Sequence, residues 1–68
     1  MKANNDNKPR LMAMAEVCQQ TSLSRAMINK LRASGRFPTA VQLSERRVAF
    51  LRTEVEQFID ERIAARAA

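Results

Sequence analysis

The chain has 68 residues, of which 46% are apolar, and it carries a formal net charge of +5. A chain of this length supports one hydrophobic core at most. Its apolar runs are much shorter than the ~18 residues that a transmembrane helix needs. The polar N-terminus also lacks the apolar stretch of a signal peptide, so we expect a cytoplasmic protein.

The residues needed for metal or covalent chemistry are scarce. The chain contains no histidine and one cysteine, Cys18, which cannot form an internal disulfide and is expected to be a small core residue. It has no glycine-rich phosphate loop, and its closely spaced carboxylates fall on a solvated helix. The sequence therefore predicts no metal site, no cofactor, no small-molecule substrate and no enzymatic activity.

Positive charge is concentrated in the middle of the chain. Between residues 25 and 52, seven basic residues accompany one acidic residue, Glu45. A face that is merely solvated usually mixes both signs, so this bias favours a polyanionic partner. Composition alone leaves both nucleic acid and an anionic membrane surface open.

The N-terminal segment and the first helix are predicted from polarity and spacing. Residues 1–10 are polar and include Pro9, which predicts a disordered arm ahead of one domain over residues 11–66. Three apolar residues then follow the i, i+3, i+4 spacing of a short helix over 13–20: Met14, Val17 and Cys18.

A second helix is predicted between two clear end signals. Ser24 is a natural N-cap, and Leu23 before it can pack against Ile28 as a hydrophobic staple. Gly35 ends this helix. The expected buried stripe consists of Met27, Ile28 and Leu31. The exposed face is expected to be basic, with Arg25, Asn29 and Arg36 clustered on it and Ala26, Lys30 and Ala33 continuing the arc. The candidate DNA contacts of this region are Ser24, Arg25, Ala26, Asn29, Lys30 and Arg36.

The remaining residues predict a hairpin and a closing helix. Over residues 40–51 the apolar period changes to two, with a polar tip at Ser44 to Arg47, which is typical of a two-stranded ribbon. Thr53 and Glu56 then form a T-x-x-E capping box that begins a helix. The apolar face of that helix contains Val55, Phe58, Ile59 and Ile63, and we expect the core to include Phe37, Phe50 and Phe58.

This order of elements predicts a mainly α winged helix-turn-helix with a small β-hairpin. The second helix can enter the major groove of double-stranded DNA, where Arg pairs with guanine and Asn with adenine. Arg25 and Asn29 are therefore the expected base readers. Arg46 and Arg47 at the hairpin tip are expected to contact the adjacent backbone or minor groove.

Five motifs in this order also resemble the AlpA-type phage regulators, whose fold is related to excisionases and to the DNA-binding part of MerR-type proteins. The matching stretches are EV at 16–17, TSLSR at 21–25, GRFP at 35–38, SERRVAF at 44–50 and EVEQFIDERIAAR at 54–66. The resemblance covers about residues 11 to 66.

The resemblance implies a regulator carried by prophages or genomic islands that acts on transcription or as an excision factor. It implies that the helix at TSLSR is the recognition helix, with Arg25, Asn29 and Lys30 on it. It also implies an arginine in the wing, which is Arg46 in this chain. The chain departs from the family pattern at five positions. Glycine is usual at Ser22, Ser44 and Ala49, tryptophan at Phe50, and tyrosine is frequent at Asn29.

Two other classes of function stay open. One is a protein-interaction module such as an anti-repressor or antitoxin, and the other is a helix that lies on a membrane surface. No heptad repeat of useful length follows the hairpin, so we expect a monomer in solution that stacks on repeated DNA sites.

Overall fold

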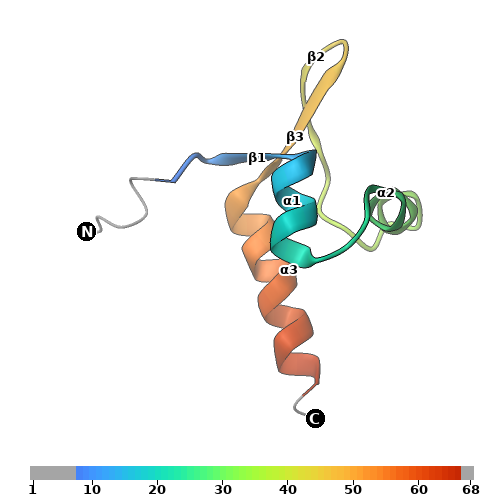
Figure 1. Ribbon diagram of the computed structural model, residues 1–68, viewed down its shortest axis with the longest axis vertical. Helices are drawn as coiled ribbons and strands as arrows, with labels where there is room; N and C mark the ends of the chain where they lie inside the picture. The colour runs from blue at the N-terminus through green and yellow to red at the C-terminus, as the bar shows by residue number, and fades with distance from the viewer. Residues whose placement is uncertain (1–7, 67–68) are drawn as a thin grey trace.

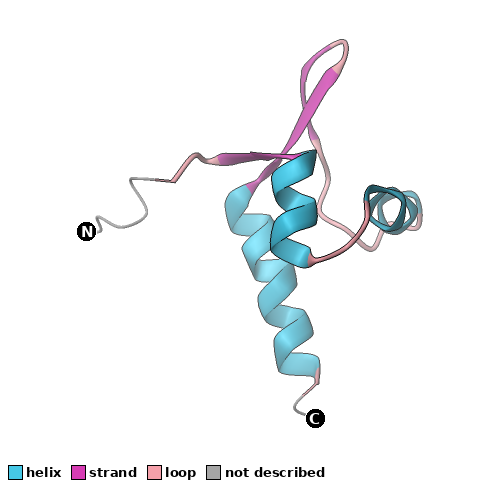
Figure 2. Cartoon of the chain, viewed as in Figure 1, coloured by secondary structure: helices cyan, strands magenta, loops and turns pink. Residues whose placement is uncertain are grey.

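The computed structural model of the protein describes residues 8–66, which contain three helices and three strands (Figures 1 and 2). In chain order these are β1 (Leu11–Ala13), α1 (Met14–Thr21), α2 (Arg25–Ala33), β2 (Val41–Ser44), β3 (Arg47–Leu51) and α3 (Arg52–Ala65). The β2–β3 hairpin extends away from the helices, and α3 runs in the opposite direction (Figure 1). The fold is the predicted winged helix-turn-helix, with α1 and α2 as the two helices and the hairpin as the wing.

The sheet has one strand more than the sequence predicts. Its three antiparallel strands have the order β1-β3-β2, so that β3 lies in the centre. The third strand was missed because β1 has only three residues, too few to show an alternating pattern, and is held by pairing with a distant strand. Residues 1–7 of the expected arm lie outside the described residues.

The core forms where the inner face of the sheet meets the helices. Met12 of β1 and Phe50 of β3 are register partners and are both fully buried. The seven residues of the core cluster are Met12, Met14, Val17, Ile28, Phe37, Phe50 and Val55. The ring of Phe37 lies 5.5 Å from that of Phe50 in an edge-to-face arrangement and 4.8 Å from that of Phe58, as measured between centroids. The prediction that the phenylalanines belong to the core is therefore confirmed for Phe37 and Phe50, whereas Phe58 is partly buried and packs against the core from outside.

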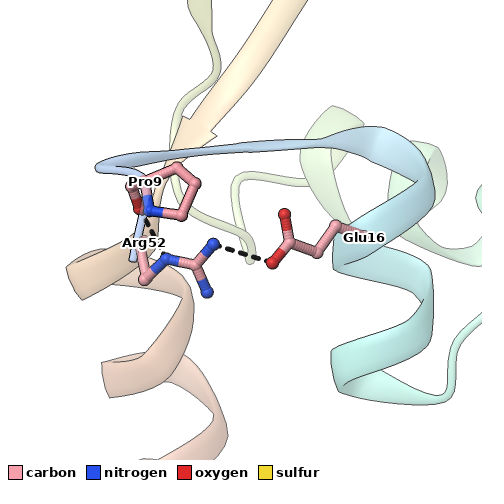
Figure 3. Close-up of polar contacts among 3 residues, drawn as sticks. All are labelled: Pro9, Glu16 and Arg52. Atoms are coloured by element: carbon pink, nitrogen blue, oxygen red, sulfur yellow. Dashed lines mark hydrogen bonds and ion pairs between the residues drawn. The ribbon is translucent and has the colours of Figure 1, made fainter. Parts of the chain in front are cut away.

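Arg52 ties the N-terminal segment and α1 to the start of α3 (Figure 3). Its Nε donates to the carbonyl oxygen of Pro9 at 2.6 Å, and its Nη2 contacts Glu16 Oε2 at 2.7 Å. Its backbone N–H donates to the carbonyl oxygen of Arg10 at 2.8 Å. Only 11% of its side chain is exposed, so this arginine supports the fold and does not belong to the exposed basic surface.

The start of α3 also differs from the prediction. The helix begins at Arg52, and the capping position is Leu51, which makes no side-chain capping bond. The expected capping box of Thr53 and Glu56 is therefore wrong. Strand β3 leads into α3 without an intervening loop, so Thr53 lies inside the first turn and not before it.

The turn between α1 and α2 requires a left-handed residue. Ser22 has a φ of +63°, and its N–H donates to the carbonyl oxygen of Cys18 at 2.8 Å. Thr21 Oγ1 accepts from the N–H of Leu23 at 3.3 Å, which directs the chain toward α2. A side chain at such a φ is strained, which explains why glycine would suit this position.

Two residues of the predicted apolar faces remain accessible to solvent. On α2, Ile28 is fully buried as expected, but Met27 is 41% exposed. On α3, Val55 is fully buried, whereas Ile63, two turns further along, is 50% exposed. The expected burial of Met27 is therefore wrong, because a helical period identifies an apolar face but cannot show where along the helix the neighbouring elements end.

We expect the substitution Ser22→Gly to raise the free energy of unfolding by about 0.5–1 kcal/mol, because it relieves the left-handed strain. Urea unfolding followed by circular dichroism measures this change. Ser34→Gly is the matched control, since Ser34 has a φ of −92° and donates from Oγ to the carbonyl oxygen of Leu31. The control should lose stability. A loss in both variants would contradict the argument from strain.

Arg52→Met should lower the free energy of unfolding by about 1–3 kcal/mol, because Glu16 and the Pro9 carbonyl oxygen lose a charged hydrogen-bond donor. Arg46→Met, at the exposed hairpin tip, should change stability by less than about 0.5 kcal/mol. Both values come from the same denaturation experiment. Equal changes in the two variants would show that the contacts of Arg52 do not stabilise the domain.

Candidate nucleic-acid interface

The start of α2 is fixed by the serine that the sequence identified. Ser24 Oγ accepts a hydrogen bond from the backbone N–H of Met27 at 3.1 Å, and the carbonyl oxygen of Ser24 accepts from the N–H of Ile28 at 3.0 Å. The Ser24 hydroxyl keeps its own hydrogen, so it can still donate to an external acceptor. The cap therefore sets the first turn of α2 and presents a polar group beside it.

One exposed arc of α2 carries most of the predicted site. Successive residues turn by about 100° around a helix, so positions 25, 26, 29 and 30 share an arc of about 140°. All four side chains on this arc are exposed: Arg25, Ala26, Asn29 and Lys30. Since Ala26 is small, the helix backbone can approach a partner surface closely between the longer side chains.

Arg32 is a member of this region that sequence analysis did not select. Its Nη1 donates to Asn29 Oδ1 at 3.1 Å, and its guanidinium carbon lies 5.6 Å from the centroid of the Phe50 ring. The planar group therefore holds the Asn29 side chain while it rests against the edge of the core. The i, i+3 spacing of Asn29 and Arg32 was the available signal for this contact.

Arg36 does not join the cluster that helical spacing predicts for it. Helix α2 ends at Ala33, and Gly35 adopts a φ of +74°. The N–H of Arg36 then donates to the carbonyl oxygen of Leu31 at 2.8 Å, which closes the helix end. Arg36 consequently lies past the helix and lines a pocket that it shares with two acidic residues of α3, Glu54 and Glu61.

The wing presents the second group of predicted residues. Glu45 and Arg46 form the turn between β2 and β3, and Arg47 is the first residue of β3. Both arginines are exposed, as predicted. An irregularity in the β2–β3 pairing lies between Gln42 and Ser44, where Gln42 Nε2 donates to the Ser44 carbonyl oxygen. Figure 1 shows α2 and the hairpin as separate projections that the segment after α2 connects.

The charged groups of this surface are available to a partner. Among residues 8–66, the one ion pair joins Arg52 to Glu16, away from α2 and the wing. Arg25, Lys30 and the two wing arginines therefore have no described carboxylate within ion-pair distance. Unpaired cations on a narrow helix face and on a hairpin tip can bind phosphate oxygens.

No group of three or more His, Cys, Asp or Glu side chains within residues 8–66 could hold a metal ion. None of the helices described here combines the length and the apolar character needed to cross a bilayer.

Comparison with known proteins gives one family. No curated protein and no solved structure matches the chain significantly. The family described as prophage CP4-57 regulatory protein (AlpA) matches residues 10–63. This range runs from the residue before β1 into α3, and it includes α2, the wing and every predicted site residue. The chain therefore belongs to the family of prophage CP4-57 regulatory (AlpA) proteins.

Proposed function

We propose that this protein binds double-stranded DNA sequence-specifically, with α2 in the major groove and the wing on the adjacent backbone or minor groove. The observation that carries the proposal is the exposed arc of Arg25, Asn29 and Lys30, which no described carboxylate neutralises. A helix with small and basic exposed residues fits a major groove about 12 Å wide. Membership in a prophage regulatory family supports the same function.

Base reading is assigned to two residues. Arg25 contacts guanine and Asn29 contacts adenine, since these side chains match the hydrogen-bonding edges of those bases. The Asn29 Oδ1 atom has two lone pairs, so it can accept from Arg32 and from an adenine amino group at the same time. Arg32 is therefore a positioning residue that orients the Asn29 amide before DNA arrives.

Backbone contacts are assigned to the remaining residues of the site. Arg46 and Arg47 bind phosphates beside the groove that α2 enters, and Lys30 and the Ser24 hydroxyl bind phosphates along the groove edge. Ala26 allows the close approach of the helix. Arg36, past the end of α2, contributes at most a contact with the DNA backbone, because the acidic side chains of its pocket weaken its attraction for phosphate.

The biological role that follows is control of phage or genomic-island genes, through transcription or through excision as a directionality factor. A domain with one recognition helix and one wing covers only about 600–1,000 Å² of interface, which limits the specificity of a single copy. We therefore propose a monomer in solution whose copies bind cooperatively at repeated sites. Footprinting and titration on DNA neighbouring its own gene test this arrangement.

The first test separates base contacts from backbone contacts by gel shift on preferred and random duplexes. Arg25→Ala and Asn29→Ala should cost about 1–3 kcal/mol on the preferred site only. Arg46→Ala should weaken binding to all duplexes alike and flatten the salt dependence by about one unit. Uniform losses in all three variants would overturn the assignment of the recognition helix, and a wild-type protein that binds no duplex would favour a protein-interaction module.

The second test concerns Arg32. Arg32→Lys keeps the charge but loses the planar group that holds Asn29, so it should weaken binding to the preferred duplex by about threefold to tenfold and leave binding to random DNA unchanged. In a double-mutant cycle with Asn29→Ala, the second substitution should add little, because both remove the same contact. Additive losses would show that Arg32 acts independently of Asn29.

A further inference from the structure

An apolar groove between α2 and α3 is not used by the proposed DNA contacts. Its volume is about 460 Å³. The apolar side chains that line it come from both helices and from the turn before α2: Leu23, Met27, Leu31, Phe58, Ile59 and Ile63. Three large apolar side chains are exposed within residues 8–66. Two of them, Met27 and Ile63, line this groove. Contiguous exposure of this kind marks a binding surface more often than scattered exposure does.

The charged residues of the groove are of one sign. Arg62 and Arg66 line it, and no acidic residue does. The guanidinium carbon of Arg62 lies 5.2 Å from the centroid of the Phe58 ring, which keeps this cation beside the apolar surface. Glu54 and Glu61 of α3 line a different pocket, on the other side of Phe58. A complementary occupant is therefore apolar along its centre and acidic at its flanks.

The shape of the groove favours a helical occupant. Its walls are helical, with Met27 and Leu31 one turn apart on α2 and Ile59 and Ile63 one turn apart on α3. A third helix packed along two such ridges buries apolar residues spaced i, i+3, i+4 and i+7. A second copy of this groove is a poor partner because the same arginines would face one another, and duplex DNA has no apolar ridge to fill it.

The groove lies on the side of α2 away from Arg25 and Asn29, the two proposed base-reading residues. Met27 is two positions from each of them and so about 160° away around the helix, whereas Lys30 at the edge of the arc is about 60° from Met27. Occupation of the groove therefore leaves Arg25 and Asn29 accessible.

We propose that this groove binds an amphipathic helix of a partner protein, with an apolar stripe flanked by carboxylates. The partner and DNA then bind to the domain together, so the protein can recruit a second protein to its DNA site. Binding of the helix in the groove does not depend on the DNA-binding proposal, since the groove residues do not belong to the DNA-contacting set, whereas the recruitment to a DNA site rests on the proposed function.

The probe is a designed peptide of about 18 residues, five helical turns, with leucines at i, i+3, i+4 and i+7, glutamates on the two flanks of this stripe, and alanine or glutamine at the other positions. The same peptide with lysines in place of the glutamates is its control. Anisotropy titrations with the full chain should show binding of the acidic peptide only, and amide signals of Met27, Leu31 and Ile63 should shift in nuclear magnetic resonance spectra. Ile63→Glu should weaken this binding by about tenfold or more.

Leu43→Glu is the matched control variant, because Leu43 and Ile63 are equally exposed at 50% and each substitution adds one negative charge. It should leave peptide affinity nearly unchanged. Ile63→Glu should retain its helical circular dichroism and its affinity for duplex DNA, and Arg66→Glu should also weaken peptide binding. The proposal is overturned if neither peptide binds, if both bind equally, or if the shifts map to Arg25 and Asn29. It is also overturned if sedimentation shows that the groove instead pairs two copies of the chain.

Discussion

The packing of the central strand β3 holds the rest of the structure together. Phe50 on this strand is fully buried and pairs in register with Met12 of β1, while its ring meets the edge of Phe37 and lies beneath the guanidinium of Arg32. One side chain thus connects the sheet, the loop after α2 and α2 itself. Because β3 continues directly into α3, Arg52 is placed where it can also hold the N-terminal segment and Glu16 of α1.

A small domain that buries little surface has few residues to spare for function alone. This protein meets that limit by giving each side of α2 a separate role. Ile28 faces the core, the arc around Asn29 faces solvent with unpaired cations, and Met27 faces the apolar groove. Since the three directions are set by one short helix, the cap at Ser24 and the left-handed turn at Ser22 position all of them together.

Arginine has three different roles in this chain, and the environment of each side chain decides which one. Arg52 is mostly buried and paired, so its charge stabilises the fold. Arg32 and Arg62 rest on aromatic rings, where the planar group is held at the edge of a surface. Arg25 and Arg46 are exposed and unpaired within the described residues, which makes them available to phosphates or bases. The total charge of +5 alone could not separate these roles.

Short-range signals in the sequence were sufficient for the family, the fold class, the bounds of α2 and the position of the wing. Ser24 and Gly35 act through hydrogen bonds within a few residues, so their effect can be read locally. Only the tertiary structure decided the pairing of β1, the buried role of Arg52 and the open groove beside Met27. Each of these depends on segments far apart in the chain, and a periodic pattern identifies the apolar side of a helix without showing which neighbour covers it.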